Sequence, residues 1–84
     1  MITPTADEQL RALGRVIRDA RRARDLSQEA VAGAAGVHPN QVGRLERGEA
    51  DVYTSTMLRI VEGIGVSLSD LARAYETALA GGPA

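Results

Sequence analysis

The 84-residue sequence contains no cysteine, tryptophan or phenylalanine, and its only aromatic residues are Tyr53 and Tyr75. Without cysteine, the chain has no disulfide framework and no thiolate metal site. Hydrophobic residues make up 44% of the sequence, but many of them are alanine, so the core must be a thin one between closely approaching helices. We therefore expect a single all-α domain, residues 1–84, small enough that a dimer partner would add stability.

The sequence also lacks a signal peptide and any apolar run of about 18 residues, so we expect a cytoplasmic protein without membrane contact. His38 is the only histidine. The carboxylates are scattered, with neither a Gly-rich phosphate loop nor metal-ligand spacing among them. We therefore expect no enzymatic activity, no cofactor and no small-molecule ligand.

The charged residues are unevenly distributed along the chain. The net charge of −1 argues mildly against nucleic-acid binding, which usually relies on a positive surface. However, eight arginines precede residue 48, namely Arg11, Arg15, Arg18, Arg21, Arg22, Arg24, Arg44 and Arg47. The remainder is dominated by the acidic residues Glu49, Asp51, Glu62, Asp70 and Glu76. This asymmetry indicates an interaction surface on the basic half.

The spacing of apolar residues and of capping residues predicts five helices, over residues 6–24, 27–35, 39–47, 54–64 and 67–80. In the first, a buried face is set by Leu10, Leu13, Ile17 and Ala20. In the last, an apolar stripe continues through Tyr75 and Leu79, beyond the expected end of the bundle. That surplus apolar surface either contacts a second copy of the chain or folds back on the first helix.

The stretch 26–48 is the most informative part of the sequence. Ser27 is a suitable N-cap, and Gly36 can adopt the positive φ that ends a helix and reverses the chain. His38 is then the expected cap of the next helix and Pro39 its first residue. This pattern predicts two short helices joined by a tight turn, the arrangement of helix-turn-helix motifs that read the major groove.

The second of these short helices has a polar outer face. Because Val42 and Leu45 must point inward, the side chains left outward at and after its start are His38, Pro39, Asn40, Gln41 and Arg44. Asparagine and glutamine side chains can form two hydrogen bonds with adenine, and arginine can do so with guanine. We therefore predict that these five residues read DNA bases.

The sequence resembles the XRE-type helix-turn-helix domains, the group of the lambdoid phage repressors and Cro. The matching positions are Ile17-Arg18 and Arg21, Ser27-Gln28-Glu29, Gly36-Val37, Val42 through Leu45-Glu46 to Gly48, and Leu58 with Gly65-Val66-Ser67. They span roughly Leu13 to Leu71. As a spaced set, they are more specific than any single motif among them. In size the chain is similar to the single-domain controller proteins of restriction-modification systems.

The resemblance implies a compact five-helix, lambda-repressor-like fold and a repressor or activator that binds double-stranded DNA as a homodimer on a pseudo-palindromic operator. It implies a phosphate contact from Gln28 and a structural ion pair between Arg21 and Glu46. We predict further phosphate contacts from Ser27 and Arg47. It also assigns the dimer contact to the C-terminal helix, where the apolar candidates are Leu71, Tyr75 and Leu79.

One departure from the family supports an alternative function. Where the family commonly presents lysine, arginine or asparagine to the phosphate backbone, this chain has Glu49 and Asp51. Carboxylates are repelled by phosphates, so either this loop turns away from DNA or the affinity is modest and depends on dimerisation. The alternative is an antitoxin or protein-interaction module with the same fold and weak or no DNA binding.

Overall fold

The computed structural model describes residues 3–81, so the two ends of the expected 1–84 domain lie outside the described residues. Its helices are α1 (Ala6–Ala23), α2 (Gln28–Ala35), α3 (Pro39–Glu46), α4 (Thr54–Ile64) and α5 (Leu68–Leu79). The described residues contain no strand, and the all-α five-helix fold is confirmed. No helix in this range is long and apolar enough to cross a membrane.

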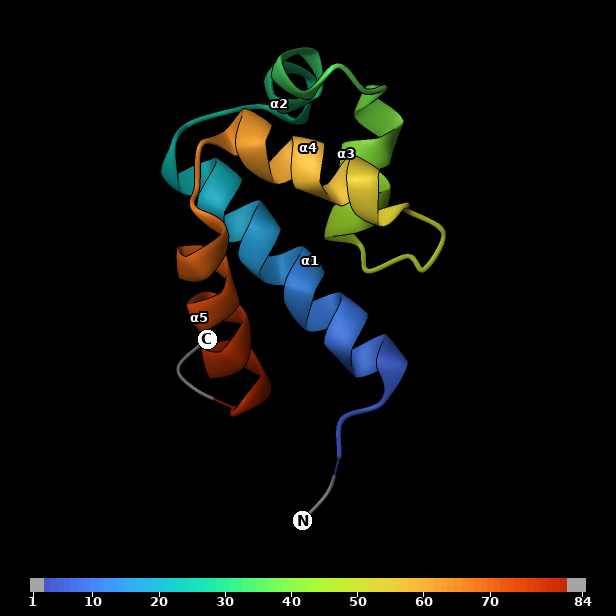
Figure 1. Ribbon diagram of the computed structural model, residues 1–84, viewed down its shortest axis with the longest axis vertical. Helices are drawn as coiled ribbons and strands as arrows, with labels where there is room; N and C mark the ends of the chain where they lie inside the picture. The colour runs from blue at the N-terminus through green and yellow to red at the C-terminus, as the bar shows by residue number, and fades with distance from the viewer. Residues whose placement is uncertain (1–2, 82–84) are drawn as a thin grey trace.

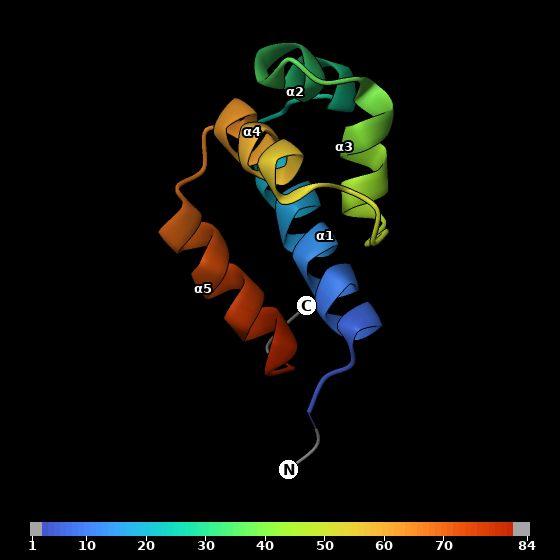
Figure 2. The same cartoon turned by 45° about the vertical axis from the view of Figure 1, so that its right-hand side comes forward.

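The long helix α1 runs diagonally through the molecule (Figure 1). α2, α3 and α4 gather around its C-terminal part, and α5 lies along its other side (Figure 2). The strongest packing outside this cluster is that of α5 on α1. α5 therefore does not project from the bundle.

Side-chain caps set the starts of α1, α2, α3 and α5, whereas α4 begins after Tyr53 without one. The hydroxyl of Ser27 accepts a hydrogen bond from the Ala30 N–H at 3.0 Å, and the hydroxyl of Ser67 accepts one from the Asp70 N–H at 3.1 Å. Both serines have extended backbones, so α2 and α5 begin one residue later than the sequence predicted. Each cap satisfies an N–H group that has no partner within its helix.

The hydrophobic core contains one layer of aliphatic side chains. The largest fully buried side chains are Ile17 of α1, Val31 of α2, Val42 of α3 and Ile60 of α4. Leu71 adds a side chain from α5 that is 3% exposed. Because all five helices contribute and none provides a large aromatic ring to the buried centre, the helices must lie close together.

Two glycines allow the end of α3 to touch α1. A Cβ atom on Gly14 would lie 2.5 Å from the backbone oxygen of Glu46. Just past α3, Gly48 has a φ of +76°, and a Cβ there would lie 2.9 Å from the backbone nitrogen of Arg11. No side chain fits between these backbones, so the C-terminal end of α3 is held directly against α1.

We predict that Gly14→Ala lowers the free energy of unfolding by about 1–3 kcal/mol or more, because α1 and α3 must separate to admit the methyl group. Gly33→Ala is the matched control. Gly33 is an exposed helical residue whose added Cβ would meet nothing within 4 Å. Alanine there should raise the free energy of unfolding by about 0.5–1 kcal/mol. Urea unfolding measures the free energy of unfolding of both variants. Equal effects of the two substitutions would contradict the close contact between α1 and α3.

Candidate nucleic-acid interface

α2 and α3 pack against each other across a short turn. Gly36 ends α2 in the left-handed conformation with a φ of +70°, and the Val37 N–H closes the turn by donating to the Ala32 oxygen at 3.0 Å. His38 then caps α3, with Nδ1 accepting a hydrogen bond from the Asn40 N–H at 3.0 Å. Figure 2 shows the result, with α2 across the top of the molecule and α3 descending along its side.

The predicted base-reading residues lie at the solvent-facing side of α3. The side chains of His38 and Asn40 are exposed, whereas Pro39, Gln41 and Arg44 are half-buried. Because the cap uses Nδ1 of His38 as an acceptor, the neutral imidazole carries its proton on Nε2. The start of α3 thus offers an imidazole N–H and two side-chain amides.

Arg44 and Arg47 are paired with carboxylates of the following loop. Glu49 bridges the two, with Oε1 at 3.4 Å from Nε of Arg44 and Oε2 at 2.7 Å from Nε of Arg47. Asp51 contacts Nη2 of Arg44 through Oδ2. Hydrogen bonding from Arg47, followed by that from Arg44, holds the pKa of the Glu49 carboxyl below its usual range. The loop therefore does not turn away from α3, the helix whose outer face is expected to meet DNA.

The backbone dictates this return of the loop. After the left-handed turn at Gly48, its N–H donates to the Leu45 oxygen at 3.1 Å, and the Glu49 N–H donates to the Arg44 oxygen at 3.0 Å. These bonds bring the chain back along the end of α3. The glycine was visible in the sequence, but spacing alone did not show which way the two carboxylates would point.

The predicted phosphate-binding residues at α2 have structural partners. The Ser27 hydroxyl is used in its cap, and Nε2 of Gln28 donates to Oε1 of Glu46 at 3.1 Å. This contact turns the half-buried Gln28 side chain toward α3 and leaves one of its amide hydrogens for another acceptor. Arg47, by contrast, has a side chain that is 60% exposed.

A buried ion pair joins α1 to the end of α3. Nε and Nη2 of Arg21 donate to the two carboxylate oxygens of Glu46 at 2.6 and 3.0 Å, and Nη1 donates to the Leu26 oxygen at 2.8 Å. Both residues are 8% exposed. The hydrogen bond with Glu46 raises the pKa of Arg21. Two parallel bonds at a buried site fix the position of α3 relative to α1.

We predict that Arg21→Met lowers the free energy of unfolding by about 3–5 kcal/mol, because Glu46 is left buried without its counter-charge. The double variant Arg21→Met/Glu46→Met should lose less than either single variant. Arg73→Met is the control, since Arg73 pairs with Asp70 at an exposed site. Its loss should stay below about 1 kcal/mol. Chemical denaturation monitored by circular dichroism measures the free energy of unfolding of every variant. A loss for Arg21→Met no larger than that for Arg73→Met would contradict the structural role of the Arg21–Glu46 pair.

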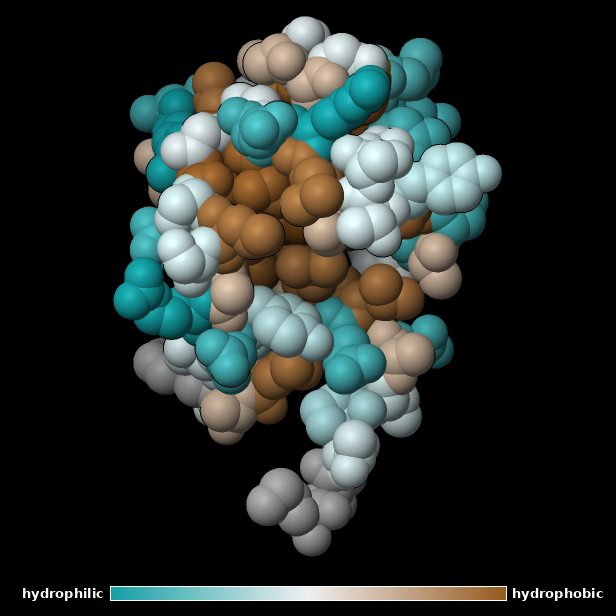
Figure 3. Space-filling view, in the orientation of Figure 1, coloured by the Kyte–Doolittle hydropathy of each residue, from teal (hydrophilic) through white to brown (hydrophobic). Residues whose placement is uncertain are grey.

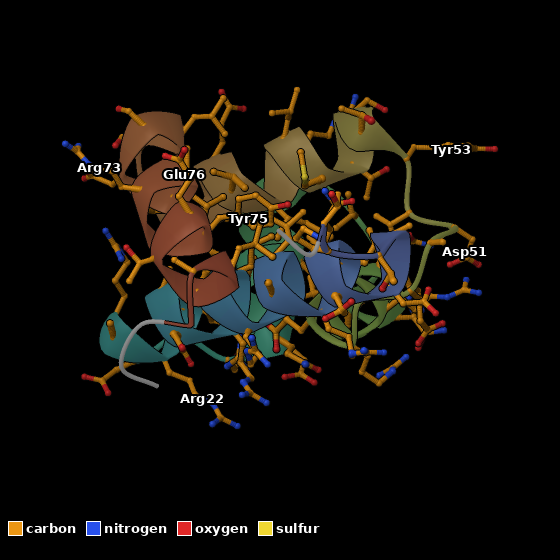
Figure 4. All side chains as sticks on the ribbon, turned by 90° about the horizontal axis from the view of Figure 1, so that it is seen from below. Arg22, Asp51, Tyr53, Arg73, Tyr75 and Glu76 are labelled. Carbon is orange, nitrogen blue, oxygen red and sulfur yellow. The ribbon has the colours of Figure 1, made fainter. Side chains whose placement is uncertain are left out.

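The assignment of Leu71 to a dimer interface needs correction. Leu71 is 3% exposed and belongs to the core, so it is a core residue that adds at most the floor of a surface groove. Tyr75 and Leu79 are half-buried, because α5 lies along α1 instead of continuing past the bundle. In Figure 4, Tyr75 lies between α5 and the neighbouring helices, whereas Arg73 points away from the molecule.

The exposed apolar surface lies elsewhere, around the start of α5. Leu58 and Leu68 are 42% and 55% exposed. Leu68 also lines a groove between α1, α4 and α5 whose other lining residues are Gln9, Leu10, Leu13, Met57, Leu71, Ala72 and Tyr75. Figure 3 shows these helices presenting a continuous hydrophobic area on one side of the molecule. We call this groove, together with Leu58, the apolar face.

A family model described as a helix-turn-helix domain matches residues 12–76. Two of the similar solved structures are of the clp gene regulator ClgR from Corynebacterium glutamicum, both with a TM-score of 0.77. One is 25% identical and covers 86% of this chain and 77% of that chain. The other is 23% identical and covers 92% and 96%.

A third similar structure is of a single-residue mutant of the restriction-modification controller protein C.Esp1396I. It is 18% identical, with a TM-score of 0.77, and the match covers 84% of this chain and 90% of that chain. No curated protein matches the sequence. The family match spans α2 and α3 completely, and the similar structures extend the likeness to the five-helix fold.

Proposed function

The chain belongs to the helix-turn-helix domain family, and from this we propose that it is a transcriptional regulator that binds double-stranded DNA through α3. The observation that carries the proposal is that α3 is fixed on one side and polar on the other. One side of this helix is fixed to α1 by the Arg21–Glu46 pair, and the other presents imidazole, amide and guanidinium groups to solvent. The likeness to ClgR, which is a gene regulator by its description, supports the same function.

In the proposed complex, α3 enters the major groove. The amides of Asn40 and Gln41 suit adenine, and the guanidinium of Arg44 suits guanine. His38 and Pro39 lie at the start of the helix, close to the bases. Phosphates are contacted by Arg47 and by the N-terminal end of α2 with Ser27 and Gln28.

We also propose that two copies bind a pseudo-palindromic operator, with their recognition helices about 34 Å apart. The support is the apolar face, which includes the two most exposed leucines of the described chain, Leu58 and Leu68. An isologous contact would bury this face of one copy against the same face of the other. Tyr75 lines the groove of this face, whereas Leu79 borders a more polar hollow near Glu8 and Arg11.

Glu49 and Asp51, the carboxylates of the loop that follows α3, favour a second candidate function. If Glu49 and Asp51 keep Arg44 and Arg47 from DNA, the domain acts as a protein-interaction module, for example an antitoxin. Selection of bound fragments from a random DNA pool separates the two functions. A palindromic consensus supports the regulator, and no enrichment supports the interaction module.

We predict that Arg44→Ala weakens binding to the selected sequence by about 1–3 kcal/mol and relaxes the preference at one base pair of each half-site. Arg47→Ala should weaken binding to all sequences alike, because phosphates are the same everywhere. Titrations on the selected sequence and on random DNA test both variants. Equal losses on the two DNAs for Arg44→Ala would remove its base-reading role.

We predict that Leu68→Glu gives a folded monomer with weakened operator binding, because it places a charge in the middle of the apolar face. Thr77→Glu is the matched control, since it adds the same charge at an exposed position of the same helix. Sedimentation at micromolar concentration measures the assembly state. A dimer that survives Leu68→Glu would show that the interface lies elsewhere on the surface.

A further inference from the structure

We propose that Glu49 and Asp51 are positioning residues for base reading, which hold the Arg44 guanidinium so that its free edge meets a guanine. This inference rests on the proposed function, because it concerns how α3 would read DNA. It reverses the simplest view of an acidic loop beside a DNA-binding helix, in which carboxylates only repel phosphates.

Arg44 has more hydrogen-bond donors than the loop carboxylates use. A guanidinium has five N–H donors in a planar fork, and Nε and Nη2 form one edge while Nη1 and Nη2 form the outer edge. Glu49 accepts a hydrogen bond from Nε and Asp51 accepts one from Nη2, so the two carboxylates engage two of the three guanidinium nitrogens. Nη1 has no hydrogen-bond partner among the described residues. Nη1, together with the second hydrogen of Nη2, remains for O6 and N7 of a guanine.

The carboxylates are well placed to hold this orientation. The Glu49 backbone is bonded to the oxygen of Arg44 itself, and the second oxygen of its carboxylate is held by Arg47. Glu49 is therefore held by its backbone hydrogen bond and by Arg47, in addition to its contact with the Arg44 side chain. The pKa of Glu49 is lowered by these arginines, so the carboxylate stays charged as the pH falls toward its ordinary value.

Positioning affects specific and non-specific binding in opposite directions. A long arginine side chain that is already oriented loses less conformational freedom when it meets its base. The same carboxylates oppose any approach in which Arg44 or Arg47 serves only as a positive charge for phosphates. Together, these effects increase the ratio of specific to non-specific affinity, which is the quantity that determines site selection.

The test compares the sequences that the full chain selects from a random DNA pool for the wild type, Asp51→Asn, Glu49→Gln and Arg44→Ala. Asp70→Asn is the matched control, because it also removes one negative charge and breaks an exposed arginine–aspartate pair, but on α5. Thermal unfolding of each variant checks the fold. Asp51 has a side chain that is 56% exposed, so its amide variant should fold as the wild type does.

We expect the wild type to select a guanine at one position of each half-site. Asp51→Asn should reduce that preference by about fivefold or more, toward the level of Arg44→Ala, and Glu49→Gln should reduce it in the same direction. Both amide variants should bind random DNA more tightly at low salt. Adding Asp51→Asn to Arg44→Ala should cause no further loss at the guanine, and Asp70→Asn should keep the wild-type preference.

Two results would overturn the inference, and they distinguish failure of the positioning role alone from failure of the proposed function. If the loop variants bind both selected and random DNA more tightly with an unchanged guanine preference, the carboxylates are only competitors for the arginines, while the regulator function stands. If the wild type enriches no sequence, the DNA-binding proposal fails and the positioning role fails with it.

Discussion

The Arg21–Glu46 ion pair is the interaction on which the arrangement of the other helices depends. Removing two charges from water is unfavourable, and the pair is tolerated because every contact is made with good geometry. Arg21 uses Nε, Nη1 and Nη2, and Glu46 also accepts a hydrogen bond from Gln28. Side chains from α1, α2 and α3 therefore meet at one carboxylate. These directional bonds, which hydrophobic contact does not provide, help to define the position of α3 relative to α1 and α2.

The thin core makes such directional contacts more important. With aliphatic side chains of modest size in the centre, the helices approach until their backbones touch. Gly14 permits this between α1 and α3, and a Cβ on Gly63 would lie 3.0 Å from the Val31 oxygen, where α4 crosses α2. Protein interiors are close-packed, so a position defined by backbone contact has little room for adjustment. The polar face of α3 is consequently held in place by backbone contacts on the opposite side of the same helix.

The sequence predicted the parts of this structure that depend on local chemistry. Apolar spacing and the caps at Ser27, His38 and Ser67 were sufficient for five helices, and Gly36 for the turn between α2 and α3. The family resemblance, confirmed by the helix-turn-helix match, supplied the expected partner of Arg21, which spacing could not provide across 25 residues.

What the sequence did not predict depends on contacts between distant segments. The apolar stripe of α5 was visible, but its neighbour was not, so Leu71 was assigned to a partner when it is buried against the molecule's own core. The acidic loop posed a similar problem, because the composition showed two carboxylates after α3 without showing that hydrogen bonds from Gly48 and Glu49 return them to it.

The fixation of α3 against α1 also has a consequence for motion. A helix of eight residues is too short to persist alone in water, where isolated helices of fewer than about 12–15 residues are marginal. The glycine contacts and Glu46 tie the C-terminal end of α3 to α1. The amide hydrogens in the C-terminal part of α3 should therefore exchange with solvent more slowly than those at its exposed start. The end of α3 that is tied to α1 should thus open together with α1, whereas the start of α3, where His38 and Asn40 are exposed, can open locally.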